Sequence, residues 1–174
     1  HAEDLLVLLK AFSLFKKWTK SHMKLVFAEP QVLKAKGFAE KLDTYKYRED
    51  LVFVGAPQGS RQFSHSGFAP ADLLAAAYAV IMPQPASSAG LGFVAALRAA
   101  TPLLIPENSA FGEQWVGHVY AANFSDANSL GAQLQLLYRN EKLRGERVAA
   151  AAARLAAIDP HQHALAFLAA ATAP

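Results

Sequence analysis

The sequence predicts an α/β fold in which a parallel sheet is covered by helices on both faces. Short apolar runs alternate with segments of helical periodicity along the chain, which is typical of repeated strand–helix units. The strand candidates are continuous apolar runs rather than alternating ones, as expected for a sheet buried on both faces. The composition, 53% hydrophobic and 18% charged, excludes a disordered or collagen-like chain.

The first part of the chain predicts two helix–strand units. Apolar residues recur at helical spacing over 4–19, with Asp4 as N-cap and with basic residues on solvated faces near the end of the helix: Lys16, Lys17 and Lys20. A buried strand is expected over 24–28, a helix over 34–45, and a second strand over 51–54, which Gly55 closes. Residues 56–69 are rich in Gly, Pro and Ser and predict a loop.

The second part continues the alternation. A helix is expected over 70–77, with Pro70 in its first turn, then a strand over 78–82, a helix over 90–99 and a strand over 102–105. A turn region leads to a strand over 119–122, and Asp126 or Asn128 caps a helix that ends at 138. Further helices are expected over 141–157 and 159–171. Ligands of parallel α/β sheets bind at the carboxyl ends of strands, so we expect one crevice shared by the loops after Ala28, Gly55, Met82 and Ile105.

Charge and composition exclude several classes of function. The net charge is +3 and there are no cysteines, so neither a disulfide framework nor thiolate chemistry is expected. No basic stripe is interleaved with aromatics, so we expect no nucleic-acid partner. The spacing of His161 and His163 does not place them on one helical face, and no metal-binding motif is present, so no metal site is expected. We expect a cytoplasmic protein, with weak peripheral attraction to the inner membrane face left open.

Several segments come in an order and spacing that resemble the group 1 (family 4) glycosyltransferases. They are MKLVFA (23–28), TYKYRED (44–50), ADLLAAAYAVIMP (71–83), ATPLLI (100–105) and LYRNEKLR (137–144). The resemblance implies that residues 1–174 form a single Rossmann-like nucleotide-sugar-binding domain, the C-terminal half of a two-domain GT-B fold, with C-terminal helices at about 141–171. It also implies an acceptor-binding N-terminal domain, on the same or another chain.

The donor-site motif of this family is present in altered form. The family signature reads Glu-Gly-Phe-Gly-x-Pro-x-x-Glu-Ala and is followed by Gly-Thr-Pro; anchored on Thr101 and Pro102, residues 87–96 here read SSAGLGFVAA. The resemblance implies a loop whose amides face the donor diphosphate at a helix N-terminus, formed by Ser87, Ser88, Ala89, Gly90 and Leu91. Both family glutamates are replaced, by Ser87 and Ala95. Alanine cannot accept the ribose hydroxyls, which would weaken donor binding by about one to two orders of magnitude.

Two further positions follow from the same resemblance. Lys34 stands at the family's phosphate-binding lysine, while the family's Gly-Arg pair is replaced by Glu29 and Pro30. Gly55 ends the strand whose loop lines the base pocket. No catalytic residue can be assigned, and no cofactor is expected beyond a nucleotide-diphosphate sugar as donor substrate. A purely structural interpretation stays open, in which Gly90, Gly92 and Ala95 only let a helix approach the sheet and Lys34 is a solvated lysine.

The resemblance implies the donor-binding domain of a hexosyltransferase-class enzyme that transfers a sugar to an acceptor, with a partly eroded site and no catalysis by this domain alone. The alternative is a non-catalytic glycosyltransferase-like domain that acts in protein interaction or structure. A different Rossmann-like binding module is a third interpretation. The absence of Gly-x-Gly-x-x-Gly after the first strand argues against dinucleotide binding.

Overall fold

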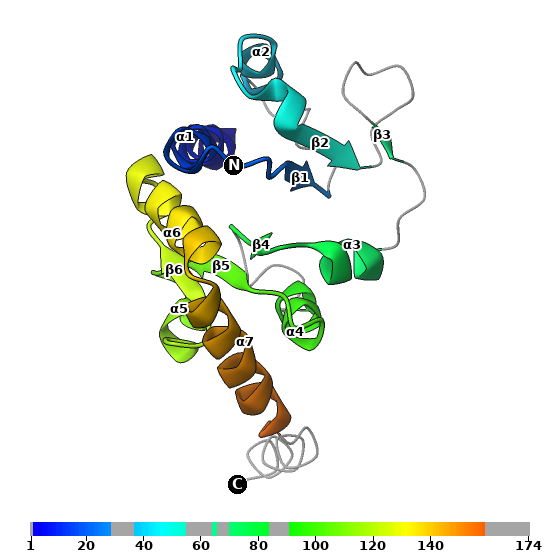
Figure 1. The fold of residues 1–174 in the computed structure, drawn as a ribbon, viewed down its shortest axis with the longest axis vertical. Helices are drawn as coiled ribbons and strands as arrows, with labels where there is room; N and C mark the ends of the chain where they lie inside the picture. Colours follow the sequence, from blue (N-terminus) through cyan, green and yellow to red (C-terminus); the bar gives the residue numbers. More distant parts are fainter. Residues whose placement is uncertain (1, 29–36, 55–63, 66–69, 84–90, 159–174) are drawn as a thin grey trace, which may run out of the picture.

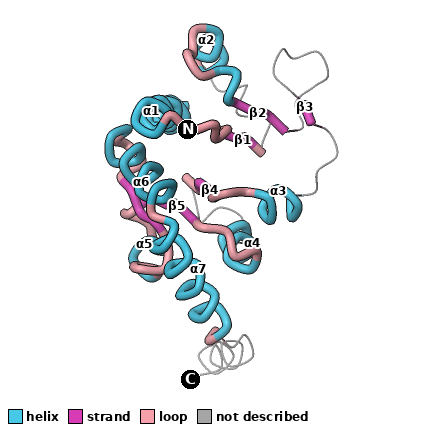
Figure 2. Tube along the Cα trace, in the orientation of Figure 1, coloured by secondary structure: helices cyan, strands magenta, loops and turns pink. Residues whose placement is uncertain are grey.

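The computed structural model describes residues 2–28, 37–54, 64–65, 70–83 and 91–158, and shows a mixed α/β chain of helices and short parallel strands (Figures 1 and 2). No helix in these ranges is both long and apolar enough to cross a membrane. The elements are, in chain order, α1 (Ala2–Thr19), β1 (Leu25–Phe27), α2 (Phe38–Asp43), η2 (Arg48–Asp50), β2 (Leu51–Val54), β3 (Ser64–His65), α3 (Pro70–Ala76), β4 (Val80–Ile81), α4 (Leu91–Arg98), β5 (Leu103–Pro106), α5 (Ala110–Gln114), β6 (Tyr120–Ala122), α6 (Ala127–Arg139) and α7 (Glu141–Ala156).

The described strands form two parallel sheets where we expected one. The first has the order β1-β2-β3, with Leu25 opposite Leu51, and the second has the order β4-β5-β6, with Ile81 opposite Leu104. The loops expected to share one crevice after Ala28, Gly55 and Met82 lie outside the described residues.

One hydrophobic cluster nevertheless joins the two sheets. Its buried members come from α1, α2, α6, β1, β2, β5 and β6, and include Leu8, Leu9, Phe12, Phe15, Leu25, Phe27, Phe38, Leu42, Leu51, Phe53, Leu104, Tyr120, Ala122, Leu130 and Leu137. Phe27 and Phe53 stack with ring centroids 4.9 Å apart, and Phe38 of α2 contacts both rings edge-on. Helix α1 thus covers parts of both sheets with a single apolar face.

The prediction that strands are buried on both faces is confirmed for β5 and is wrong for β1. Leu104 belongs to the cluster shared with α1, whereas its neighbours Leu103 and Ile105 belong to a second cluster with Phe93 and Trp115. Successive strand residues point to opposite faces, so β5 is covered on both. In β1, Val26 remains 47% exposed between two buried neighbours. An apolar run predicts a strand here but does not show which face is covered.

Helix α6 packs against α1 through a small residue. A Cβ placed on Gly131 would lie 3.2 Å from the Trp18 ring and 3.3 Å from the Ala11 carbonyl oxygen, so glycine permits the close approach. The Arg139 guanidinium also donates to the Trp18 carbonyl oxygen at 2.8 Å. Asp126 is the N-cap of α6, because its carboxylate accepts from the amides of Asn128 and Ser129.

Several element boundaries differ from the predictions. Strand β3 lies inside the expected loop, and α5 and η2 were not predicted. Helix α5 is only five residues long and depends on the Ser109 side chain, which accepts from the Gly112 amide at 3.0 Å. Such short elements carry no hydrophobic period. The helix expected over 159–171 and residues 34–36 of the helix expected over 34–45 lie outside the described residues.

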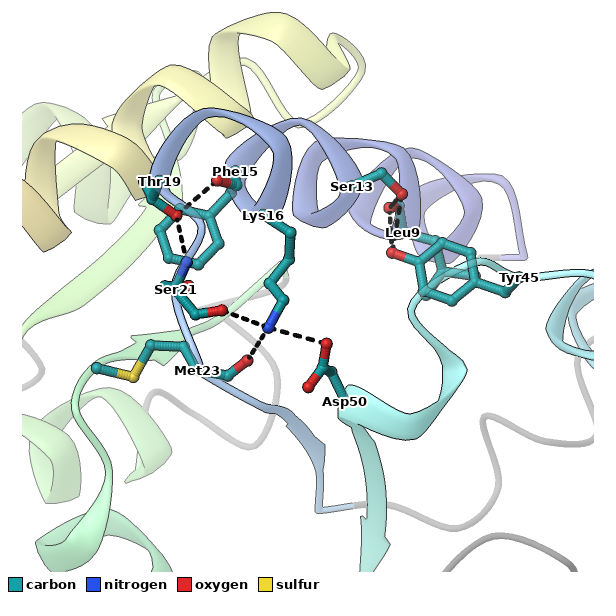
Figure 3. Close-up of polar contacts among 9 residues, drawn as sticks. All are labelled: Leu9, Ser13, Phe15, Lys16, Thr19, Ser21, Met23, Tyr45 and Asp50. Carbon is teal, nitrogen blue, oxygen red and sulfur yellow. Dashed lines mark hydrogen bonds and ion pairs between the residues drawn. The ribbon is translucent and has the colours of Figure 1, made fainter.

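The Lys16 ammonium, expected on a solvated helix face, is buried and fully partnered (Figure 3). Its Nζ lies 2.8 Å from Asp50 Oδ2 and donates to the carbonyl oxygens of Ser21 at 2.7 Å and Met23 at 3.1 Å. These partners stand in the segment that leads to β1 and at the start of β2. One side chain therefore fixes the end of α1 relative to both strands.

A second buried contact joins α1 to the chain after α2. The Tyr45 hydroxyl donates to the Leu9 carbonyl oxygen at 2.8 Å and accepts from Ser13 Oγ at 3.0 Å (Figure 3). Burial is the largest cause that raises the pKa of Tyr45 to about 12, from an ordinary value of 10.0.

We expect Lys16→Met to destabilise the fold by about 2–4 kcal/mol, because it leaves the Asp50 carboxylate and two carbonyl groups without their partner. The matched control is Lys17→Met, which changes an exposed lysine of the same helix and should cost no more than about 0.5 kcal/mol. Urea unfolding measures both. Equal stabilities of the two variants would contradict the structural role of Lys16.

The Tyr45 contact should make stability fall at alkaline pH. The folded state holds the phenol proton more tightly than the unfolded chain, so this stabilisation is complete below pH 10 and is lost as the pH rises toward 12. We expect the advantage of wild type over Tyr45→Phe in unfolding free energy to shrink by about 1–2 kcal/mol between pH 9 and pH 12. A pH-independent difference between the two proteins would refute the assignment.

Candidate functional site

The structure describes two of the eight residues predicted to bind the donor. Leu91 and Ala95 both lie on α4, while Lys34, Gly55, Ser87, Ser88, Ala89 and Gly90 lie outside the described residues. Of the predicted site, the structure therefore describes only the part on α4, next to the second sheet.

At this point the amino end of α4 lies beside the end of β4. The Met82 amide, directly after β4, donates to the Leu104 carbonyl oxygen of β5 at 2.9 Å. The first turn of α4 touches the same residue, since a Cβ on Gly92 would lie 3.4 Å from Met82 Cε. A helix N-terminus beside the carboxyl end of a parallel strand is the arrangement in which backbone amides bind phosphate groups.

The exposure pattern of α4 separates packing residues from solvent-facing ones. Phe93, Ala96 and Leu97 are buried, and the Phe93 ring lies 4.6 Å from Phe111 and 5.3 Å from Trp115, centroid to centroid. Leu91 is 70% exposed, and Ala95 is exposed as well. The interpretation that Ala95 is small to let the helix approach the sheet is therefore wrong. At Gly92 an added methyl group would make only an ordinary contact.

The carboxyl end of α4 is closed by a left-handed residue. Ala100 has φ 54°, and the amide of Thr101 donates to the Ala96 carbonyl oxygen at 3.1 Å, a Schellman-type ending in which glycine is usual. The buried Thr101 hydroxyl donates to the Leu74 carbonyl oxygen of α3 at 2.7 Å. The Pro102 carbonyl oxygen accepts from the Val80 amide at 2.8 Å. These three residues thus join α3, α4 and the start of the second sheet.

Sequence reasoning missed a row of arginines on α7. The guanidinium carbons of Arg144, Arg147 and Arg154 lie 4.4, 4.3 and 5.0 Å from ring centroids, above Tyr78, Tyr120 and Trp115 respectively. Spacings of three and seven residues place such side chains on one helical face, and this was the available signal. From the sequence we expected only a helix over 141–157 here.

The described residues contain no cluster of three or more His, Asp or Glu side chains arranged to hold a metal ion. Burial raises the pKa of Tyr120, whose ring lies under Arg147, and the guanidinium charges of Arg147 and Arg144 oppose that shift. This tyrosine belongs to the hydrophobic cluster that it shares with α1 and α6.

The left-handed turn at Ala100 gives a test with a defined sign. Ala100→Gly should stabilise the fold by about 1 kcal/mol, because glycine has no Cβ to clash in this conformation. The same substitution at the exposed helical residue Ala152 should destabilise by about 1 kcal/mol. Thermal or urea unfolding compares the two. Destabilisation by both variants would show that residue 100 does not hold a left-handed turn.

A scan against protein-family models and searches of curated proteins and solved structures find no match for this chain. The structure itself shows a mixed α/β chain with short parallel sheets.

Proposed function

We propose that this chain is the nucleotide-sugar-binding domain of a GT-B glycosyltransferase, with a weakened donor site. The observation that carries the proposal is the β4–α4 unit, in which a helix begins beside the carboxyl end of a parallel strand. The helix dipole and free amides at such a point favour a diphosphate. Residues 87–90, which lead into the helix, supply the small and hydroxylated residues of the donor loop in this proposal.

The carboxyl end of α4 is consistent with the same assignment. Ala100-Thr101-Pro102 stands where the family signature has Gly-Thr-Pro, and Ala100 holds a backbone conformation that glycine adopts without strain. Thr101 and Pro102 hold this turn against α3 and the second sheet.

Position 95 explains why the site would bind weakly. The Ala95 side chain faces solvent on the helix that follows the donor loop, where the family glutamate accepts the ribose hydroxyls. A methyl group there removes the acceptor without disturbing the packing of Phe93 or Leu97. An alanine at position 95 would therefore weaken ligand binding and leave the fold intact.

Calorimetric titration of the intact protein with UDP, GDP and their sugars tests the proposal. We expect binding in the millimolar range, and a gain of about 10–100-fold for the double variant Ser87→Glu/Ala95→Glu. The control is Ala152→Glu, which adds a carboxylate at an exposed position of another helix. If neither wild type nor the double variant binds any of these nucleotides, donor recognition is excluded and the non-catalytic alternative gains support.

A further inference from the structure

A hollow of about 160 Å³ opens at the outer edge of the second sheet, and neither Leu91 nor Ala95 lines it. It lies where the turn after α5 meets the edge strand β6 and the helices α6 and α7. Most of the lining residues are small or apolar, and two, Gln133 and Arg147, have polar side chains. The lining residues are Gly112, Val116, Gly117, Val119, Ala121, Gln133 and Arg147. Val116 stands 73% exposed at the edge of the hollow.

The charged group at this hollow is the Arg147 guanidinium, which forms no ion pair with a carboxylate among the described residues. The Arg147 guanidinium stacks on the Tyr120 ring and donates to the Val119 carbonyl oxygen. The ion pairs within the described ranges do not include Arg147, and its neighbour Glu146 pairs with Lys142. A guanidinium has five N–H donors in a planar fork, so donors remain for an anionic group after one bond to a carbonyl.

We propose that this hollow binds a short aliphatic carboxylate, with the carboxylate on Arg147 and the alkyl group among Val116, Val119 and Ala121. A volume near 160 Å³ suits about six non-hydrogen atoms, since a dry cavity of about 150 Å³ accepts benzene. Positive charge beside an apolar wall selects an anion with a hydrocarbon tail over a phosphate or an amine. The inference does not depend on the donor-binding proposal, because it uses other residues and another ligand class.

Titration with butyrate tests this site, with butanol and butylamine as comparators of similar size. Trp115 is buried and directly precedes Val116, and the carbonyl oxygen of Trp115 accepts from the Val119 amide. In a Trp18→Phe background, the fluorescence of Trp115 therefore reports on the hollow. We expect saturable binding of butyrate in the millimolar range. Arg147→Met should weaken it by about tenfold or more, and Arg154→Met, which changes an arginine over Trp115 that does not line the hollow, by less than about twofold.

Rim variants keep the test decisive if Arg147→Met fails to fold. Val116→Lys should strengthen butyrate binding and Val116→Glu should weaken it, each by about two- to fivefold, because the side chain is exposed at the rim. Val26→Glu, at an exposed apolar residue of β1, should leave the affinity unchanged. Absence of saturation up to about 50 mM butyrate, equal responses to butanol, or affinities indifferent to charge at position 116 would each overturn the proposal.

Discussion

A single buried ammonium group organises the amino-terminal half of this molecule. Lys16 stands one turn before the end of α1, and its three contacts fix the chain at Ser21, at Met23 and at Asp50. An uncompensated charge at this depth would be costly, so the ammonium, the carboxylate and the two carbonyl groups must come together in one geometry. These contacts hold the start of β1 beside the start of β2 independently of the hydrogen bonds between the two strands. They also turn the apolar face of α1 toward the cluster that the two sheets share.

The sequence predicted most long elements because their packing follows a period. Helices α1, α6 and α7 and strands β2 and β5 lie within a few residues of their expected ranges, since each buries a face that recurs at helical or strand spacing. The short elements α5 and η2 were not predicted, because caps and turns stabilise them and they show no hydrophobic periodicity. The burial of Lys16 also escaped prediction: its partners are two backbone carbonyl groups and a carboxylate 34 positions away, which no local pattern reveals.

The site was predictable in part, and for a similar reason. The helix before Thr101 and the strand after it were predicted from their apolar runs, but the left-handed turn at Ala100 between them was not. The arginine row of α7 was not predicted, because each arginine stacks on an aromatic ring that is distant in the sequence: Tyr78, Tyr120 and Trp115. The division of the strands into two sheets was likewise invisible, because an apolar run specifies a strand but not its neighbour.

The two ends of α4 constrain different properties of the chain. At the carboxyl end, Ala100 holds a left-handed backbone conformation that favours glycine, so this position affects the stability of the fold. Toward the amino end, the Ala95 side chain faces solvent, so a substitution there leaves the packing of the helix intact. A helix kept for structure alone would be free to vary at position 95 but would still need its ending at Thr101 and its buried Phe93. The turn at Ala100 and the packing of Phe93 are therefore explained by the fold alone, and a measurement of nucleotide affinity tests whether position 95 faces a ligand.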